Sequence, residues 1–142
     1  MSSPQRAFVV GATGFTGRAV VAALRERGIQ TVAHLRPESA RRAEWTARFE
    51  ALGAEVDVSP WEAEALLAAL RRSRPTQIYA LLGTTRKRAR GEGKTAIEGY
   101  EAVDYGLTKL VIDAASTLEP PLPVFVYLSS IGVHPRTTNP YL

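Results

Sequence analysis

The sequence predicts an α/β fold, a three-layer doubly wound parallel sheet with the strand order 3-2-1-4-5. Three observations predict it. Short apolar runs alternate along the chain with amphipathic stretches of helical length. A glycine turn at residues 11–17 follows the first apolar run and opens the first amphipathic one. The run at 77–82 is nearly all apolar, as a strand covered on both faces should be. In such folds ligands bind at the carboxyl ends of the strands, where the winding reverses between strands one and four.

The first half of the chain predicts three strands and two helices. The first strand should run over 6–10, and the helix after the glycine turn should end at Gly28, which can adopt the left-handed conformation. A second strand at 31–35 is stopped by Pro37. The second helix, at 38–52, has Trp45 and Phe49 at helical spacing and should bury both rings. A short third strand is expected at 55–58.

The second half continues the alternation. A third helix should end at Arg74, because Pro75 follows it. The fourth strand, at 77–82, leads into a polar and basic loop at 84–94. A long helix is expected over 97–117, where apolar residues recur on one stripe, and a fifth strand over 124–128 after a proline-rich link. The tail from 129 to 142 is predicted to be a loop.

Bulk composition excludes several classes of function. At 142 residues the chain should be a single domain, residues 1–142. The absence of cysteine excludes disulfides and thiolate catalysis, and His34 and His134 lack ligand spacing to an acid, so no metal site is expected. No apolar run reaches the roughly 20 residues that span a bilayer. The net charge of +4 is too modest to indicate a nucleic-acid partner. We expect a cytoplasmic protein without a membrane anchor.

The glycine turn is the strongest functional signal. Gly11 should let the chain reverse at the end of the first strand, Gly14 should let a ligand approach the backbone, and Gly17 should let the helix pack closely on the sheet. The first helical turn carries unpaired N–H groups and the positive end of the helix dipole. Together they predict a seat for the pyrophosphate of a dinucleotide, with an empty structural turn as the alternative. We expect the intervening Thr13, Phe15 and Thr16 to line the same site.

The end of the second strand indicates which dinucleotide would bind. NAD sites usually place an acid there to accept hydrogen bonds from the ribose, but this chain has Arg36. A guanidinium binds a 2′-phosphate in a bidentate fork, so NADP(H) is favoured, with NAD possible. Arg41 and Arg42 could reinforce that site or be solvated charges. Asp57, at the end of the third strand, could accept from the adenine amino group or cap the following turn.

With these residues placed, the sequence resembles the atypical short-chain dehydrogenase/reductase family, and most closely its NmrA-like and Tat-interacting-protein branch. The glycine turn has the GxxGxxG form of that family. The other segments that carry the resemblance are Leu82-Gly83-Thr84-Thr85-Arg86, Val103-Asp104-Tyr105, Asp113-Ala114-Ala115, Leu128-Ser129-Ser130 and Asn139-Pro140-Tyr141-Leu142. The resemblance implies a Rossmann fold that binds a nicotinamide cofactor and, in active members, Ser-Tyr-Lys chemistry.

The resemblance also implies roles for individual residues. Ser130 would orient the substrate oxygen and Tyr141 would be the acid/base, while Ser129 would line the cofactor ribose. Leu82, Gly83 and Thr84 would form the cofactor-lining corner after the fourth strand. The family lysine belongs four residues after Tyr141, and the sequence ends at Leu142. We therefore expect a truncated form of a longer protein, one that binds cofactor at best.

Two alternatives for the longer protein stay open. It could be an NADP(H)-dependent oxidoreductase or a nucleotide-sugar-epimerase-like enzyme that acts on a small-molecule substrate, or a non-catalytic regulator that senses NADP(H). The fifth strand at 124–128 should be central, yet no sixth strand follows it in this sequence. We expect its exposed edge to be covered by a second copy, which would form a homodimer, or by the tail of the chain.

Overall fold

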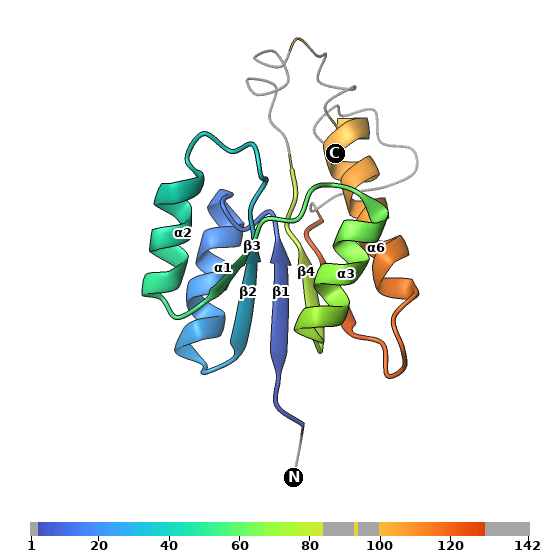
Figure 1. The fold of residues 1–142 in the computed structure, drawn as a ribbon, viewed down its shortest axis with the longest axis horizontal. Helices are drawn as coiled ribbons and strands as arrows, with labels where there is room; N and C mark the ends of the chain where they lie inside the picture. Colours follow the sequence, from blue (N-terminus) through green and yellow to red (C-terminus); the bar gives the residue numbers. More distant parts are fainter. Residues whose placement is uncertain (1–2, 84–92, 94–99, 130–142) are drawn as a thin grey trace.

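The computed structural model describes residues 3–83, 93 and 100–129. It contains one sheet of parallel strands in the order β3-β2-β1-β4-β5 (Figure 1). The strands are β1 (Arg6–Val10), β2 (Gln30–His34), β3 (Glu55–Asp57), β4 (Gln77–Ala80) and β5 (Val124–Tyr127). The predicted fold class and strand order are therefore confirmed. Each predicted strand lies within one or two residues of its expected bounds.

The central strand β1 has partners both near to it and far from it in sequence. Its pairing with β2 aligns Arg6 with Gln30, and its pairing with β4 aligns Ala7 with Gln77. Apolar side chains make up most of β1, because both of its edges and both of its faces are covered.

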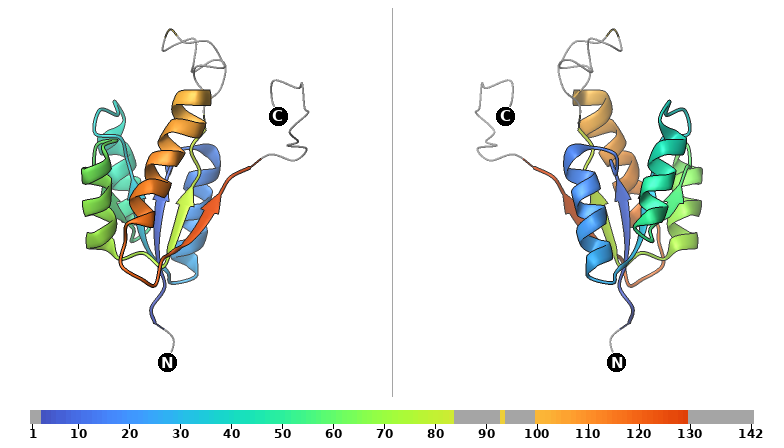
Figure 2. Two further views of the ribbon diagram at one scale, coloured as in Figure 1. Left: turned by 90° about the vertical axis from the view of Figure 1, so that its right-hand side faces the viewer. Right: turned by 90° about the vertical axis from the view of Figure 1, so that its left-hand side faces the viewer.

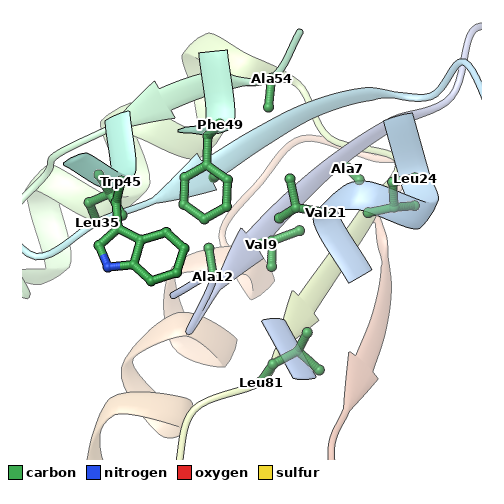
Figure 3. Close-up of a cluster of buried hydrophobic side chains, with 11 residues drawn as sticks. Ala7, Val9, Ala12, Val21, Leu24, Leu35, Trp45, Phe49, Ala54 and Leu81 are labelled. Carbon is green, nitrogen blue, oxygen red and sulfur yellow. The ribbon is translucent and has the colours of Figure 1, made fainter. Parts of the chain in front are cut away.

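Two layers of helices cover the sheet (Figure 1). One face is covered by α1 (Phe15–Glu26) and α2 (Arg42–Ala51), and the other by α3 (Ala63–Ser73) and α6 (Thr108–Ser116). Side chains alternate along β1, so Ala7 and Val9 enter the first core and Phe8 and Val10 enter the second. In the first core the rings of Trp45 and Phe49 stack with centroids 5.5 Å apart (Figure 3). The burial predicted for both rings is confirmed.

Two helices differ from the sequence expectation. The second was expected to begin at residue 38, but α2 begins at Arg42, because two consecutive turns precede it, closed by hydrogen bonds from Ser39 N–H to Arg36 O and from Arg42 N–H to Ser39 O. The long helix expected over 97–117 is not a single α-helix. Residues Tyr100–Leu107 form a π-helix, η1, and the α-helical part, α6, starts only at Thr108. Apolar spacing does not separate these two helix types over so short a segment.

The strand β5 lies at one edge of the sheet (Figure 2). Phe125 packs into the core beneath α3 and α6, whereas Val124 is 64% exposed and Tyr127 is 51% exposed. Within the part of the chain that the structure describes, β4 is its only strand partner. No described helix is long and apolar enough to cross a membrane.

Candidate functional site

The glycine turn lies where β1 ends and α1 begins, pressed against the end of β4. Gly11 has φ +75°, a conformation that L side chains rarely adopt. A Cβ atom at this position would also lie 2.5 Å from the carbonyl oxygen of Leu81. The N–H of Gly14 donates to Gly11 O at 3.2 Å and closes the turn. Glycine is therefore required at position 11 by the backbone itself.

A second glycine brings the helix against the turn. A Cβ atom at Gly17 would lie 1.9 Å from the carbonyl oxygen of Gly11, closer than any real contact. Gly17 is buried, and the first turn of α1 packs directly on the backbone of Gly11 and Ala12. This contact fixes the direction in which the N-terminus of α1 points.

The N-terminus of α1 is open and carries no compensating negative charge. Gly14 is its N-cap residue, in extended conformation at φ −68° and ψ 167°, and no side chain caps the helix. The first turn contains no acidic residue. Thr13, Gly14 and Phe15 are exposed, and Thr16 is half-buried. Unpaired N–H groups with the positive end of the dipole make this turn suited to an anion, so the residues present fit a pyrophosphate group.

Of Arg36, Arg41 and Arg42, which follow β2 most closely, Arg36 has the side chain with the fewest contacts. It is exposed, and its guanidinium makes no hydrogen bond or ion pair with any residue that the structure describes. Arg41 instead donates two hydrogen bonds to Glu44, at 2.8 and 2.6 Å. Arg42 donates only a long hydrogen bond, 3.5 Å, to Pro37 O. Arg36 and Arg42 thus keep charges that no described acid offsets, and Arg36 is the one that lies two residues from the carboxyl end of β2.

Asp57 adopts the turn-capping arrangement. Its carboxylate accepts from Ser59 N–H at 3.1 Å and from Ser59 Oγ at 3.0 Å, and it pairs with Arg72 at 3.1 Å. Only 9% of the Asp57 side chain is exposed. The capping alternative is what the structure contains, and the contact with adenine stays a prediction.

His34, at the end of β2, is buried beside this turn. Its Nε2 lies 2.7 Å from Ser59 O, and its ring packs against the edge of Trp61 with centroids 4.7 Å apart. Burial lowers the pKa of His34 below the ordinary value of 6.5, although the Ser59 hydrogen bond and the charges of Asp57 and Glu38 act in the opposite direction. The ring is therefore neutral at pH 7 and serves packing. No group of three or more potential metal ligands occurs in the described residues.

The corner after β4 brings in Asp104, which sequence reasoning named in a resembling segment but did not place in the site. Leu82 is half-buried and Gly83 is exposed, and a Cβ atom at Gly83 would lie 3.6 Å from Oδ1 of Asp104. Asp104 belongs to η1, and π-helical turns occur frequently at functional sites. Gly106, a poor helix former inside a segment that otherwise looks helical, was the sequence signal for an irregular helix here.

Of the remaining predicted residues, the structure describes only one, and it lies at the same edge of the sheet. Ser129 is exposed and follows the carboxyl end of β5. Thr84, Ser130 and Tyr141 lie outside the described residues. The structure therefore places the glycine turn, Arg36, the corner at 82–83 and Ser129 at the carboxyl ends of parallel strands, the edge at which such sheets bind ligands (Figure 1).

Comparison with known proteins gives a family and a fold. The family model described as "NAD dependent epimerase/dehydratase family" matches residues 7–141. No curated protein matches the sequence. The chain is similar to the crystal structure of a putative epimerase from Burkholderia cenocepacia J2315, with 24% identity and a TM-score of 0.68 over 97% of this chain and 42% of that one.

Two further solved structures share the fold. UDP-N-acetylglucosamine 4-epimerase from Bacillus cereus is 22% identical, with a TM-score of 0.63 over 96% of this chain and 43% of that one. AtPrR2, in a structure with NADP+ and (+)pinoresinol, is 19% identical, with a TM-score of 0.63 over 80% of this chain and 33% of that one. The present chain thus spans less than half the length of each of these structures.

Proposed function

The chain belongs to the NAD dependent epimerase/dehydratase family, and on that premise we propose that residues 11–17 hold the diphosphate of a nicotinamide coenzyme. One observation carries the proposal. The N-terminus of α1 is uncapped, has no acidic residue in its first turn and opens on a turn whose exposed Gly14 presents no side chain to a ligand. Backbone N–H groups and the helix dipole would both stabilise the two phosphate charges.

NADP(H) is the preferred form of the coenzyme in this proposal. The support is Arg36, which takes the position of the usual acid and has no described partner. A guanidinium attracts a 2′-phosphate, which a carboxylate would repel. The NADP+ in the structure of AtPrR2 is consistent with this choice. Leu82, Gly83, Thr84 and Ser129 would contact the nicotinamide half of the same coenzyme in this proposal.

The chemistry of the longer protein is proposed from the family. When bound, the coenzyme would supply hydride transfer. Ser130 would hold the substrate oxygen and Tyr141 would exchange a proton with it. Lys109 is the last lysine in the 142 residues, so we expect these residues by themselves to bind coenzyme without turnover. An NADPH oxidation assay with a panel of carbonyl compounds tests this, and turnover above background would contradict it.

The proposal is tested directly by titrating NADP(H) and NAD(H) against the 142-residue chain. Coenzyme at a hundred times its dissociation constant should raise the free energy of unfolding by about 2.7 kcal/mol. We expect that protection at a lower concentration of NADP(H) than of NAD(H). If neither coenzyme shifts the unfolding transition, the proposed function is wrong.

The β5 edge is also proposed to pair with a second copy of the chain. Val124 N–H donates to Thr76 O and Leu128 N–H donates to Ala80 O, so alternate residues of β5 face β4. The backbone groups of Phe125 and Tyr127 therefore face the free edge. A twofold axis at Val126 would pair these groups with those of the other copy. Val126 of one copy would then lie opposite Val126 of the other copy, on an apolar face of the joined sheet.

A further inference from the structure

A basic hollow lies at the end of the sheet opposite the glycine turn. It has a volume of about 590 Å³ and is formed by the amino ends of the strands, the C-terminus of α3 and the loop at Gly53. Its lining includes Arg6, Arg25, Arg72 and Arg74, and a single acidic residue, Glu55. We call it the arginine pocket. Since all strands run parallel, the length of β1 separates it from the site at residues 11–17 (Figure 1).

Two of the guanidinium groups are oriented by neutral acceptors. Arg6 Nε donates to the carbonyl oxygen of Arg74 at 2.8 Å. Arg25 donates through Nε to Leu52 O at 3.2 Å and through a terminal nitrogen to Ile29 O at 2.7 Å. A carbonyl oxygen fixes the direction of a guanidinium without cancelling its charge. Both side chains therefore keep a full positive charge, and both have N–H groups left for another acceptor.

Arg72 is held differently. One of its terminal nitrogens donates to Asp57 Oδ1 at 3.1 Å, which offsets part of its charge. Its side chain is nonetheless 68% exposed, and its other N–H groups make no hydrogen bond to any described residue. Three guanidinium groups from three different elements are thus held in place around the pocket before any ligand arrives. Such preorganisation lowers the entropic cost of binding.

The backbone at Arg74 provides an independent observation. Arg74 ends α3 in the left-handed conformation, φ 47° and ψ 57°, and is the one non-glycine residue with positive φ among those that the structure describes. In α1 and α2 the positive-φ residue lies one position beyond the C-cap and is glycine, Gly28 and Gly53. Glycine is the residue that such a position favours. An arginine therefore occupies a place where the fold alone would favour glycine, and its exposed guanidinium has no described partner.

We propose that the arginine pocket binds an anion that carries two or more phosphate groups. Guanidinium groups match phosphate oxygens in bidentate geometry, and a cluster of four can neutralise several charges at once. A volume of about 590 Å³ lies within the range of small-molecule sites. The pocket shares no residue with the glycine turn, so the two sites can be occupied together.

Inorganic tripolyphosphate is a suitable probe, because it has no base or sugar to recognise. Binding is measured by isothermal titration calorimetry at physiological salt on the 142-residue chain carrying Gly14→Asp. This substitution places a carboxylate at the N-terminus of α1 and so excludes phosphate from the glycine turn. Binding to the arginine pocket is then observed separately, whether or not the turn holds a coenzyme.

We expect one saturable site. Arg74→Gly should weaken tripolyphosphate binding by about tenfold or more, because it removes a charge-assisted hydrogen bond. Because glycine suits φ 47°, this variant should fold at least as well as its parent. Arg71→Gln is the matched control. Arg71 carries the same charge three residues earlier but does not line the pocket. It should change the dissociation constant by less than about twofold.

Two results would overturn the proposal. One is the absence of saturable binding to the folded Gly14→Asp chain. The other is an equal loss from Arg74→Gly and Arg71→Gln, which would mean attraction to the overall charge of this end of the molecule. Arg6→Gln provides a second measurement from a different element and should also weaken binding several-fold.

Discussion

The backbone of Gly17 lies directly on the carbonyl oxygen of Gly11, so close that a Cβ atom at position 17 would be 1.9 Å from that oxygen. The contact packs Gly17, which ends the turn and lies in the first turn of α1, against Gly11, the first residue of the turn. It therefore makes the position of the helix N-terminus depend on backbone packing, with no contribution from a side chain. The proposed diphosphate seat and the packing of α1 on the sheet have the same structural cause.

Gly17→Ala should destabilise the fold by about 2 kcal/mol or more, because the new methyl group has only backbone atoms to displace. Urea unfolding measures the loss. Gly28→Ala is the control, since a Cβ atom added at Gly28 would have nothing within 4 Å of it. Its cost should be limited to that of positive φ, about 1 kcal/mol. Equal losses in the two variants would contradict the contact.

Gly14→Asp should affect stability and binding in opposite directions. Gly14 is the N-cap residue of α1, and aspartate caps helices slightly better than glycine, by a few tenths of a kcal/mol. The same carboxylate would repel the coenzyme diphosphate, so affinity for NADP(H) should fall by about a hundredfold. Thermal unfolding with and without NADPH measures both effects. Undiminished protection by NADPH would place the coenzyme elsewhere on the protein.

Arg36→Asp tests the choice of coenzyme. We expect affinity for NADP(H) to fall by about tenfold or more, since a charge-assisted contact becomes a repulsion, while affinity for NAD(H) is kept or improved. Arg41→Gln is a fair control, because Glu44 already holds that guanidinium. Competitive titration of the two coenzymes gives both constants. If neither affinity changes, the assignment of Arg36 to the 2′-phosphate is wrong.

Stability should depend on pH through His34. Burial lowers the pKa of His34 in the folded protein, so the unfolded chain takes up a proton first as pH falls through about 6.5. The free energy of unfolding should be highest above about pH 7 and decline below pH 6.5, by at most about 1.4 kcal/mol per pH unit. Denaturant curves between pH 7.5 and 5.5 measure this decline.

The two histidines of the chain allow a matched comparison for that prediction. His34→Gln keeps an N–H donor for Ser59 O and should flatten the pH dependence. His134→Gln should retain it. A decline that persists in His34→Gln would assign the dependence to other groups.

The β5 edge should decide the oligomeric state. Wild-type chain is expected to sediment as a dimer, and Val126→Lys as a monomer, because the twofold axis would bring two ammonium groups together. Ile112→Lys on α6 serves as the control, since its exposure of 43% is close to the 38% of Val126. A monomeric wild-type protein at all concentrations would rule out this pairing.

Sequence reasoning predicted the fold well because its signals are local. The apolar runs become strands, Gly28 and Gly53 end helices at positive φ, and the alternation of strands and helices leaves one common topology. The glycine turn could be predicted for the same reason, since Gly17 is required by backbone contacts with Gly11 and Ala12, a few residues away.

What sequence could not predict depends on contacts between distant segments. Asp104 meets Gly83 only because η1 passes over the end of β4, and apolar spacing does not distinguish a π-helix from an α-helix. Asp57 looked equally suited to adenine or to a turn, and Arg72, on the following helix, completes the turn-capping arrangement. Arg74 was read only as the end of a helix, since no sequence signal shows that its backbone is left-handed.

The register of β1 also constrains the order of events during synthesis. Arg6 meets Gln30, 24 residues later, but Ala7 must wait for Gln77, 70 residues later, before its other side is paired. One edge of this apolar strand therefore stays unpaired in a nascent chain until residues beyond the midpoint of the sequence have been translated. Chaperones that bind extended apolar segments could bind β1 during this interval, which ends when residues 77–80 emerge and pair with it.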